Sequence, residues 1–98
     1  MINPCVFILT NNAHKFFYAG ITSNIKEELD NLSKGFLKDD LWPEDCKKLV
    51  YCEKYVFERD ALARFEMIKT LTDTKKRKII EMMNPKWLDL PKYWPLSA

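Results

Sequence analysis

The chain has 98 residues, of which 47% are hydrophobic and 13% are aromatic, and its formal net charge is +2. This length predicts a single domain, residues 1–98, with one packed core. No stretch approaches the roughly 18 consecutive apolar residues of a membrane span, and the N-terminus lacks a signal-peptide pattern, so we expect a cytoplasmic protein. Three unclustered cysteines favour reduced thiols over disulfides. His14 is the single histidine, so we do not expect a structural zinc site.

Charge is distributed unevenly along the chain. Residues 1–46 carry four lysines and seven acidic side chains, a balance of −3, and residues 47–98 carry twelve basic and seven acidic side chains, a balance of +5. A basic half can attract polyanions. An ordinary solvated helix face explains the excess about equally well.

Two short apolar and aromatic runs, residues 5–10 and 16–20, open the chain and have the length and composition of strands. Asn11 and Asn12 lie between them and suit a turn, so the segment is predicted to be a β-hairpin. Gly20 ends the second run. We expect it to serve the backbone geometry of a strand–helix junction.

A helix is predicted to follow the hairpin. Asn24 and Glu27 have the spacing of a capping box, and Gly35 is a stop signal. Residues 37–46 are acidic and interrupted by Pro43, which indicates a loop. The apolar stripe of this helix is Ile25, Leu29, Leu32 and Phe36.

The second half predicts one strand and two helices. Residues 48–56 are rich in β-formers, and a helix begins near Glu58. Thr72 to Thr74 offer N-cap oxygens to a third helix over residues 75–83. The residues expected to face inward are Ala61, Leu62, Phe65, Ile68 and Leu71 on the first of these helices, and Ile79, Ile80 and Met83 on the second.

Four cations, Lys75, Lys76, Arg77 and Lys78, crowd the first turn of this last helix, where they oppose the helix dipole. Such a cluster is tolerated on a solvent-exposed surface. It is also typical of a surface that binds the phosphates of a nucleic acid. The chain then ends in an apolar tail, residues 84–98, whose two tryptophans carry too much apolar area to be left in water. We expect the tail to wrap the domain's own surface. A protein partner or a second copy of the chain is the alternative.

Five segments, in this order and spacing, resemble the GIY-YIG nuclease superfamily, most closely its small single-domain bacterial members. The resemblance covers about residues 4–90 and lies in VFILTN (6–11), YAGITSNI (18–25), LVY (49–51), ALARFE (61–66) and MNPKWLDL (83–90).

The resemblance implies an α+β fold in which helices flank a three-stranded antiparallel sheet. It also implies cleavage of DNA phosphodiesters with one divalent metal, Mg²⁺ or Mn²⁺. In that chemistry a carboxylate holds the metal, a tyrosine activates water, and an arginine offsets charge on the phosphoryl oxygens.

Carried over by position, the family's site is only partly retained. Tyr18 keeps the second motif's tyrosine, and Glu66 keeps the metal-binding glutamate. Phe7 stands at the first motif's tyrosine, Glu28 stands at the arginine, and Leu32 stands at a polar position. Each residue also has an ordinary structural interpretation: Tyr18 in sheet packing, Glu66 paired with Lys69, and Glu28 as a first-turn acid.

The sequence therefore predicts a GIY-YIG-like domain that is impaired in metal-dependent cleavage and retained for nucleic-acid binding. The main reason is Glu28, which puts an anion where the scissile phosphate would sit. Two alternatives stay open. One is a working nuclease with an altered site, in which Glu28 and Glu66 share a metal. The other is a protein-interaction or self-association module.

Overall fold

The computed structural model describes residues 3–33 and 46–93, and shows the predicted α+β architecture. A three-stranded antiparallel sheet has the order β2-β1-β3. The elements are β1 (Cys5–Thr10), β2 (Phe17–Thr22), α1 (Ile25–Ser33), β3 (Lys48–Lys54), α2 (Glu58–Lys69), α3 (Asp73–Met83) and a short 3-10 helix, η1 (Leu90–Tyr93).

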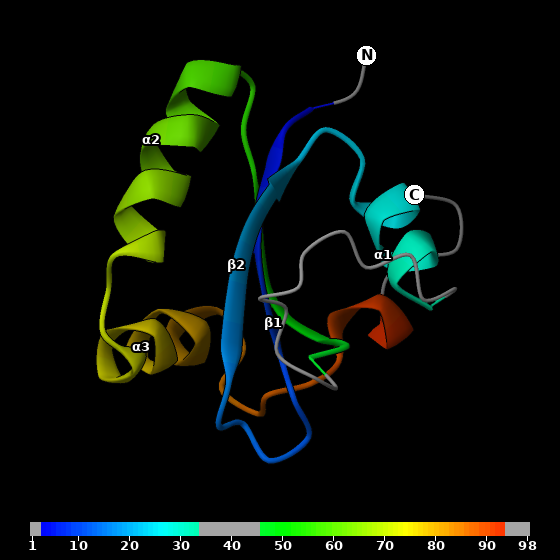
Figure 1. Cartoon of the computed structure of the whole chain (residues 1–98), viewed down its shortest axis with the longest axis vertical. Coiled ribbons are helices and arrows are strands. Elements are labelled where there is room, and N and C mark those ends of the chain that lie inside the picture. Colours follow the sequence, from blue (N-terminus) through cyan, green and yellow to red (C-terminus); the bar gives the residue numbers. More distant parts are fainter. Residues whose placement is uncertain (1–2, 34–45, 94–98) are drawn as a thin grey trace.

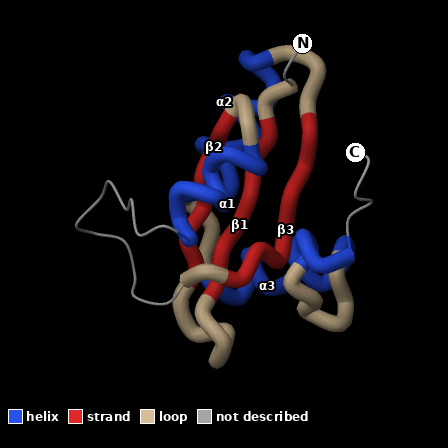
Figure 2. Tube along the Cα trace, turned by 90° about the vertical axis from the view of Figure 1, so that its right-hand side faces the viewer, coloured by secondary structure: helices blue, strands red, loops and turns tan. Residues whose placement is uncertain are grey.

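Helices cover both faces of this sheet. α2 and α3 lie on one side, and α1 and η1 lie on the other (Figure 1). The turned view shows β1 between its two partners (Figure 2). Among the described residues, no helix has the combination of length and apolar content that crossing a membrane requires.

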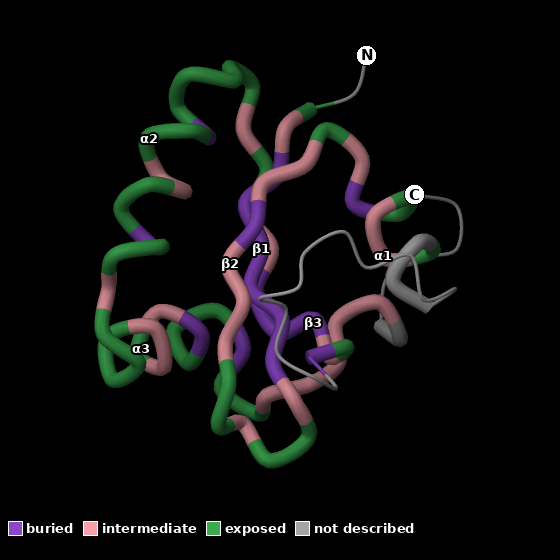
Figure 3. Tube along the Cα trace, viewed as in Figure 1, coloured by how far each residue is buried: buried purple, intermediate pink, exposed green. Residues whose placement is uncertain are grey.

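The central strand β1 is the core of the molecule, and all six of its residues are buried (Figure 3). Because side chains alternate along a strand, β1 contributes to two separate apolar clusters. Phe7 and Leu9 pack on the α1 side with Ile25 and Leu49. On the side of α2 and α3, the buried residues are Val6, Ile8, Val50, Tyr51, Ala61, Ile68 and Ile80.

Gly20 lies inside β2, not at a strand–helix junction as predicted, because the strand continues to Thr22. It is the cross-strand partner of Phe7 in the antiparallel register. A Cβ atom at Gly20 would lie 2.3 Å from Cζ of Phe7, and under 3 Å from both Cε atoms. The glycine is therefore needed because the Phe7 ring lies directly across its backbone.

Side-chain caps begin two helices at the predicted positions. Glu27 N–H donates to Asn24 Oδ1 at 3.2 Å, which confirms the first half of the capping box at α1. In a full capping box the Glu27 carboxylate would accept from the backbone N–H of Asn24. Here Glu27 Oε2 accepts from Asn24 Nδ2 instead, at 3.4 Å. At α3, Lys75 N–H donates to Thr72 Oγ1 at 3.3 Å, so the helix begins at Asp73, two residues before the predicted start.

Two residues predicted to face inward do not. Leu62 is 48% exposed and Met83 is 45% exposed. The buried face of α2 is set by Ala61 and Ile68, which are two helical turns apart, and Leu62 lies about 100° around the helix from Ala61. On α3 the buried residue is Ile80. The predictions for Gly35, Phe36 and most of the acidic loop fall outside the described residues.

The described part of the tail wraps the sheet, as predicted. Buried Asn84 donates through Nδ2 to the carbonyls of Val50 (3.1 Å) and Leu88 (2.9 Å). Trp87 packs on the α2 and α3 side, and Leu90 packs on the α1 side. The tail thus passes from one face of the sheet to the other, and the residues from 94 onward lie outside the described part.

The contact between Phe7 and Gly20 predicts a strong coupling. Gly20→Ala should lower the free energy of unfolding by about 1–3 kcal/mol, because the new methyl group overlaps the ring. In a Phe7→Leu background the same change should cost much less, because the ring atoms that would clash are gone. Urea unfolding of the wild type, both single variants and the double variant measures this coupling. Additive losses would show that Gly20 is needed for another reason.

Candidate functional site

The two residues at the family's motif positions are neighbours on the α1 side of the sheet. The ring centroids of Phe7 and Tyr18 are 6.4 Å apart, with the planes tilted by 43°. Phe7 is 3% exposed and lies in the core. Unlike the tyrosine of the motif, it has no hydroxyl. Tyr18 is half-buried and packs against the same apolar cluster. The packing interpretation of Tyr18 thus matches its surroundings.

Glu28 lies on α1, the helix that covers this same face. It is half-buried in the first turn, and its N–H donates to the carbonyl of Asn24 at 3.1 Å. A carboxylate in the first turn is favoured by the helix dipole. Three of the five carried-over positions, Phe7, Tyr18 and Glu28, therefore belong to one side of the sheet. The side chain of Leu32 lies outside the described part.

Glu66 belongs to the other side. It lies on α2, is exposed, and pairs with Lys69 at 3.2 Å, as its ordinary interpretation predicted. The sheet separates α2 from Tyr18 and Glu28, so Glu28 and Glu66 do not face each other. Within residues 3–33 and 46–93, no three His, Cys, Asp or Glu side chains gather as a metal site would require. The resemblance implies a metal held by one carboxylate, so a metal role for Glu66 stays a prediction.

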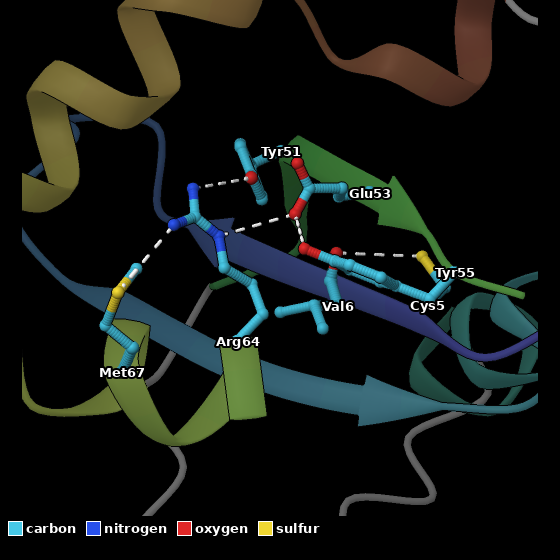
Figure 4. A network of polar contacts seen from close by, with 7 residues as sticks. All are labelled: Cys5, Val6, Tyr51, Glu53, Tyr55, Arg64 and Met67. Atoms are coloured by element: carbon cyan, nitrogen blue, oxygen red, sulfur yellow. Dashed lines mark hydrogen bonds and ion pairs between the residues drawn. The ribbon is translucent and has the colours of Figure 1, made fainter. Parts of the chain in front are cut away.

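Arg64 is held in a polar cluster with Tyr51 and Glu53 of β3 (Figure 4). It lies on the α2 and α3 side, where Nη2 donates to Tyr51 Oη at 3.4 Å. Its buried Nε lies 3.4 Å from Glu53 Oε1, an ion pair without hydrogen-bond geometry. Tyr55 Oη also donates to this carboxylate. An open pocket of about 190 Å³ is lined by Tyr51, Glu53, Arg64, Ile79, Met82 and Met83.

Burial raises the pKa of Tyr51, and the neighbouring charge of Glu53 adds to this, while Arg64 opposes it. Burial also raises the pKa of Tyr55, supported by its hydrogen bond to Glu53. Both hydroxyls therefore stay protonated at neutral pH. A protonated tyrosine cannot accept a proton from water, so neither hydroxyl is ready to act as a general base at neutral pH.

The cations of α3 divide into two pairs. Lys75 and Lys78 are exposed, and Lys76 and Arg77 are half-buried. Arg77 Cζ lies 5.1 Å from the ring centroid of Phe17 and 5.7 Å from that of Trp87, which are cation–π distances. Its Nη2 also donates to the carbonyl of His14. Arg77 thus links α3 to the tip of the β1–β2 hairpin.

His14 lies at that tip and stacks on Trp87, with ring centroids 4.5 Å apart and planes at 20°. Lys48 Nζ, at the first position of β3, lies 3.0 Å from His14 Nε2. Burial and the positive charges of Lys48 and Arg77 hold the pKa of His14 below its ordinary value. We call His14, Lys48, Arg77 and Trp87 the hairpin-end cluster.

Sequence reasoning missed both the hairpin-end cluster and the Arg64 cluster. It noted His14 only to exclude zinc, and Trp87 only as apolar area. A signal existed for the first cluster, since Lys48 is predicted to open the strand next to the hairpin and therefore to lie near its tip. Nothing local connects Trp87 to His14, because that contact depends on the path of the tail.

No protein-family model matches the sequence, and no curated protein is significantly similar to it. Its fold is similar to the solution NMR structure of the UPF0213 protein BH0048 from Bacillus halodurans. The TM-score is 0.59 and the identity 18%, and the match covers 92% of this chain and 95% of the other. Likeness at this identity shows a shared fold, over nearly the full length of both chains.

Tyr51 and Tyr55, the two tyrosines of the Arg64 cluster, should make the free energy of unfolding fall at alkaline pH. Folding raises the pKa of Tyr51 and Tyr55, so their stabilisation is complete below about pH 10, the ordinary tyrosine value, and is lost as pH rises through the folded-state values. Urea unfolding above about pH 10 should show the free energy falling by up to about 1.4 kcal/mol per pH unit for each tyrosine. Tyr55→Phe should reduce this slope.

Tyr18→Phe is the matched control, because it removes one hydroxyl but leaves both members of the cluster. It should keep the wild-type slope. Equal slopes for wild type and Tyr55→Phe would show that Tyr55 does not titrate as described.

Proposed function

We propose that the protein is a GIY-YIG-like domain that binds nucleic acid and is impaired in metal-dependent phosphodiester cleavage. The observation that carries the binding half is the set of cations on α3. Lys75 and Lys78 are exposed, and in the described part of the chain none of the four α3 cations forms an ion pair with a carboxylate. Uncompensated cations on one helix attract a phosphate backbone, because each contact releases counterions.

Two adjoining features extend this basic surface. Arg77 joins α3 to the hairpin end, where Lys48 also lacks a carboxylate partner among the described residues. Aromatic rings lie among these cations, which is common where nucleic acid is bound. Charge and aromatic area thus meet on the surface formed by α3, the start of β3 and the hairpin tip.

The impaired-cleavage half rests on Phe7 and Glu28. Phe7 has no hydroxyl to activate water, and its ring is fixed across Gly20. Two unit charges 4 Å apart interact by about 4 kcal/mol at an effective dielectric of 20, so a carboxylate at the arginine position opposes both phosphate binding and the transition state. Losing a preorganised cation alone typically costs about 100- to 1,000-fold in rate.

The binding surface is tested by replacing its exposed lysines. Fluorescence anisotropy with labelled single-stranded DNA, duplex DNA and RNA should show affinity that falls steeply with salt. The double variant Lys75→Gln/Lys78→Gln should bind more weakly and reduce the slope of log affinity against log salt by about 1–2.

The double variant Lys26→Gln/Lys54→Gln is the matched control, because it removes the same charge near the start of α1, at the far end of the sheet. It should bind as the wild type does. Equal losses in the two double variants would indicate net charge alone. No binding to any of the three probes at low salt would overturn the proposal in favour of a protein-partner role.

Cleavage is tested separately by plasmid nicking with Mg²⁺ and with Mn²⁺. Wild type and Glu66→Ala should both remain at the background rate, because Glu66 pairs with Lys69 on the side of the sheet away from Tyr18. Nicking by the wild type that Glu66→Ala abolishes would show a working nuclease, and the impaired half of the proposal would be wrong.

A further inference from the structure

His14 is held in the hairpin-end cluster as a neutral side chain. Lys48 is an ammonium donor, so the Nε2 atom that lies 3.0 Å from it accepts a hydrogen bond and carries no proton. The ring proton is then on Nδ1. Burial and two nearby cations favour this neutral form.

The backbone at this cluster is strained on both sides of the stack. His14 and Trp87 each have a φ of 55°, and they are the non-glycine residues with positive φ in the described part of the chain. Histidine tolerates this region in turns, but for a bulky tryptophan it is an outlier. Such strain persists where surrounding contacts over-determine the conformation, and it gathers at binding sites. These two residues stack directly on each other.

The charges that face His14 are all positive. Lys48 approaches from β3, Arg77 approaches from α3, and the rings of Trp87 and Phe17 are uncharged. Asp89, the nearest acid along the tail, accepts the N–H of Leu49 at 3.2 Å and makes no ion pair with Lys48. Within the described part of the chain, no carboxylate offsets these two cations.

We infer that the hairpin-end cluster binds one phosphate group of the nucleic acid between Lys48, Arg77 and His14, and that His14 takes up a proton as the phosphate binds. This inference rests on the proposed function and names the contact within it. On binding, the ammonium of Lys48 turns from Nε2 to a phosphate oxygen. Nε2, protonated from solvent, donates to the same anion, and Arg77 keeps N–H groups beyond the one that holds the His14 carbonyl.

The direction of the pH dependence follows from the charges. The bound phosphate offsets the positive field of Lys48 and Arg77, so the pKa of His14 is higher in the complex than in the free protein, where it lies below the ordinary value. Affinity therefore rises as pH falls between these two values, by at most tenfold per pH unit for one proton. Below both values, and above both, it is independent of pH.

The single histidine makes a direct test possible, because the ring C–H signals of His14 need no assignment by mutation. Proton NMR titrations are run on the full chain alone, with inorganic phosphate, and with a short oligothymidylate. Both additions should raise the pKa of His14. Anisotropy should show the oligonucleotide binding roughly three- to tenfold more tightly near pH 6 than near pH 8.

Three variants separate this contact from a general effect. His14→Gln accepts a hydrogen bond from Lys48 but does not titrate, so its affinity should not vary over this pH range. Lys48→Gln leaves the stack in place, and should raise the pKa of free His14 and weaken phosphate binding. Lys54→Gln removes the same charge from the other end of β3, and should match the wild type in both measurements.

The outcomes distinguish the two proposals. Oligonucleotide binding that is equally pH-dependent in wild type and His14→Gln, or that leaves the His14 signals unmoved, overturns this inference and leaves the proposed function standing. No oligonucleotide binding at any pH overturns the proposed function. If inorganic phosphate still raises the pKa of His14 in that case, the hairpin-end cluster is an anion site for another ligand, and its assignment to nucleic acid is wrong.

Discussion

The burial of β1 on both faces is the constraint on which the rest of the structure depends. All six of its residues are inside, so helices have to cover both sides of the sheet. α1 packs against Phe7 and Leu9, and α2 packs against Val6 and Ile8. The sheet then separates side chains on α1 from those on α2. This geometry decides which motif residues can share a site.

The sequence predicted the elements well, because each rests on a local pattern. Alternation and β-formers predicted the strands, and the caps Asn24 and Thr72 predicted the helix starts. The errors lie where the answer depends on a neighbour distant in the chain. The reason for Gly20 is the Phe7 ring on the adjacent strand, which no local pattern contains. Leu62 borders the apolar stripe of its helix, and only the packing shows which edge of the stripe is exposed.

The same limit applies to the candidate site. Phe7 and Tyr18 are neighbours through the antiparallel register of the hairpin, an element that was predicted. The pairing of Glu66 with Lys69 is local, at i and i+3, and was also predictable. The side of the sheet on which α2 packs could not be predicted from the sequence. Ile68 fixes the buried side of that helix, and Glu66 lies about 200° around it, which directs its carboxylate to solvent. Arg64, four residues before Ile68, instead reaches Glu53 and Tyr51 on β3.

The proposed binding surface depends on how its cations are held. An ion pair fixes a cation but cancels its charge, as Glu53 does for Arg64. The cations at the hairpin end are fixed differently, Arg77 by the faces of Phe17 and Trp87 and Lys48 by the imidazole of His14. An aromatic face supplies attraction without a formal negative charge. Arg77 and Lys48 are therefore positioned by the fold without a carboxylate partner among the described residues, so their positive charge is not cancelled within that part of the chain.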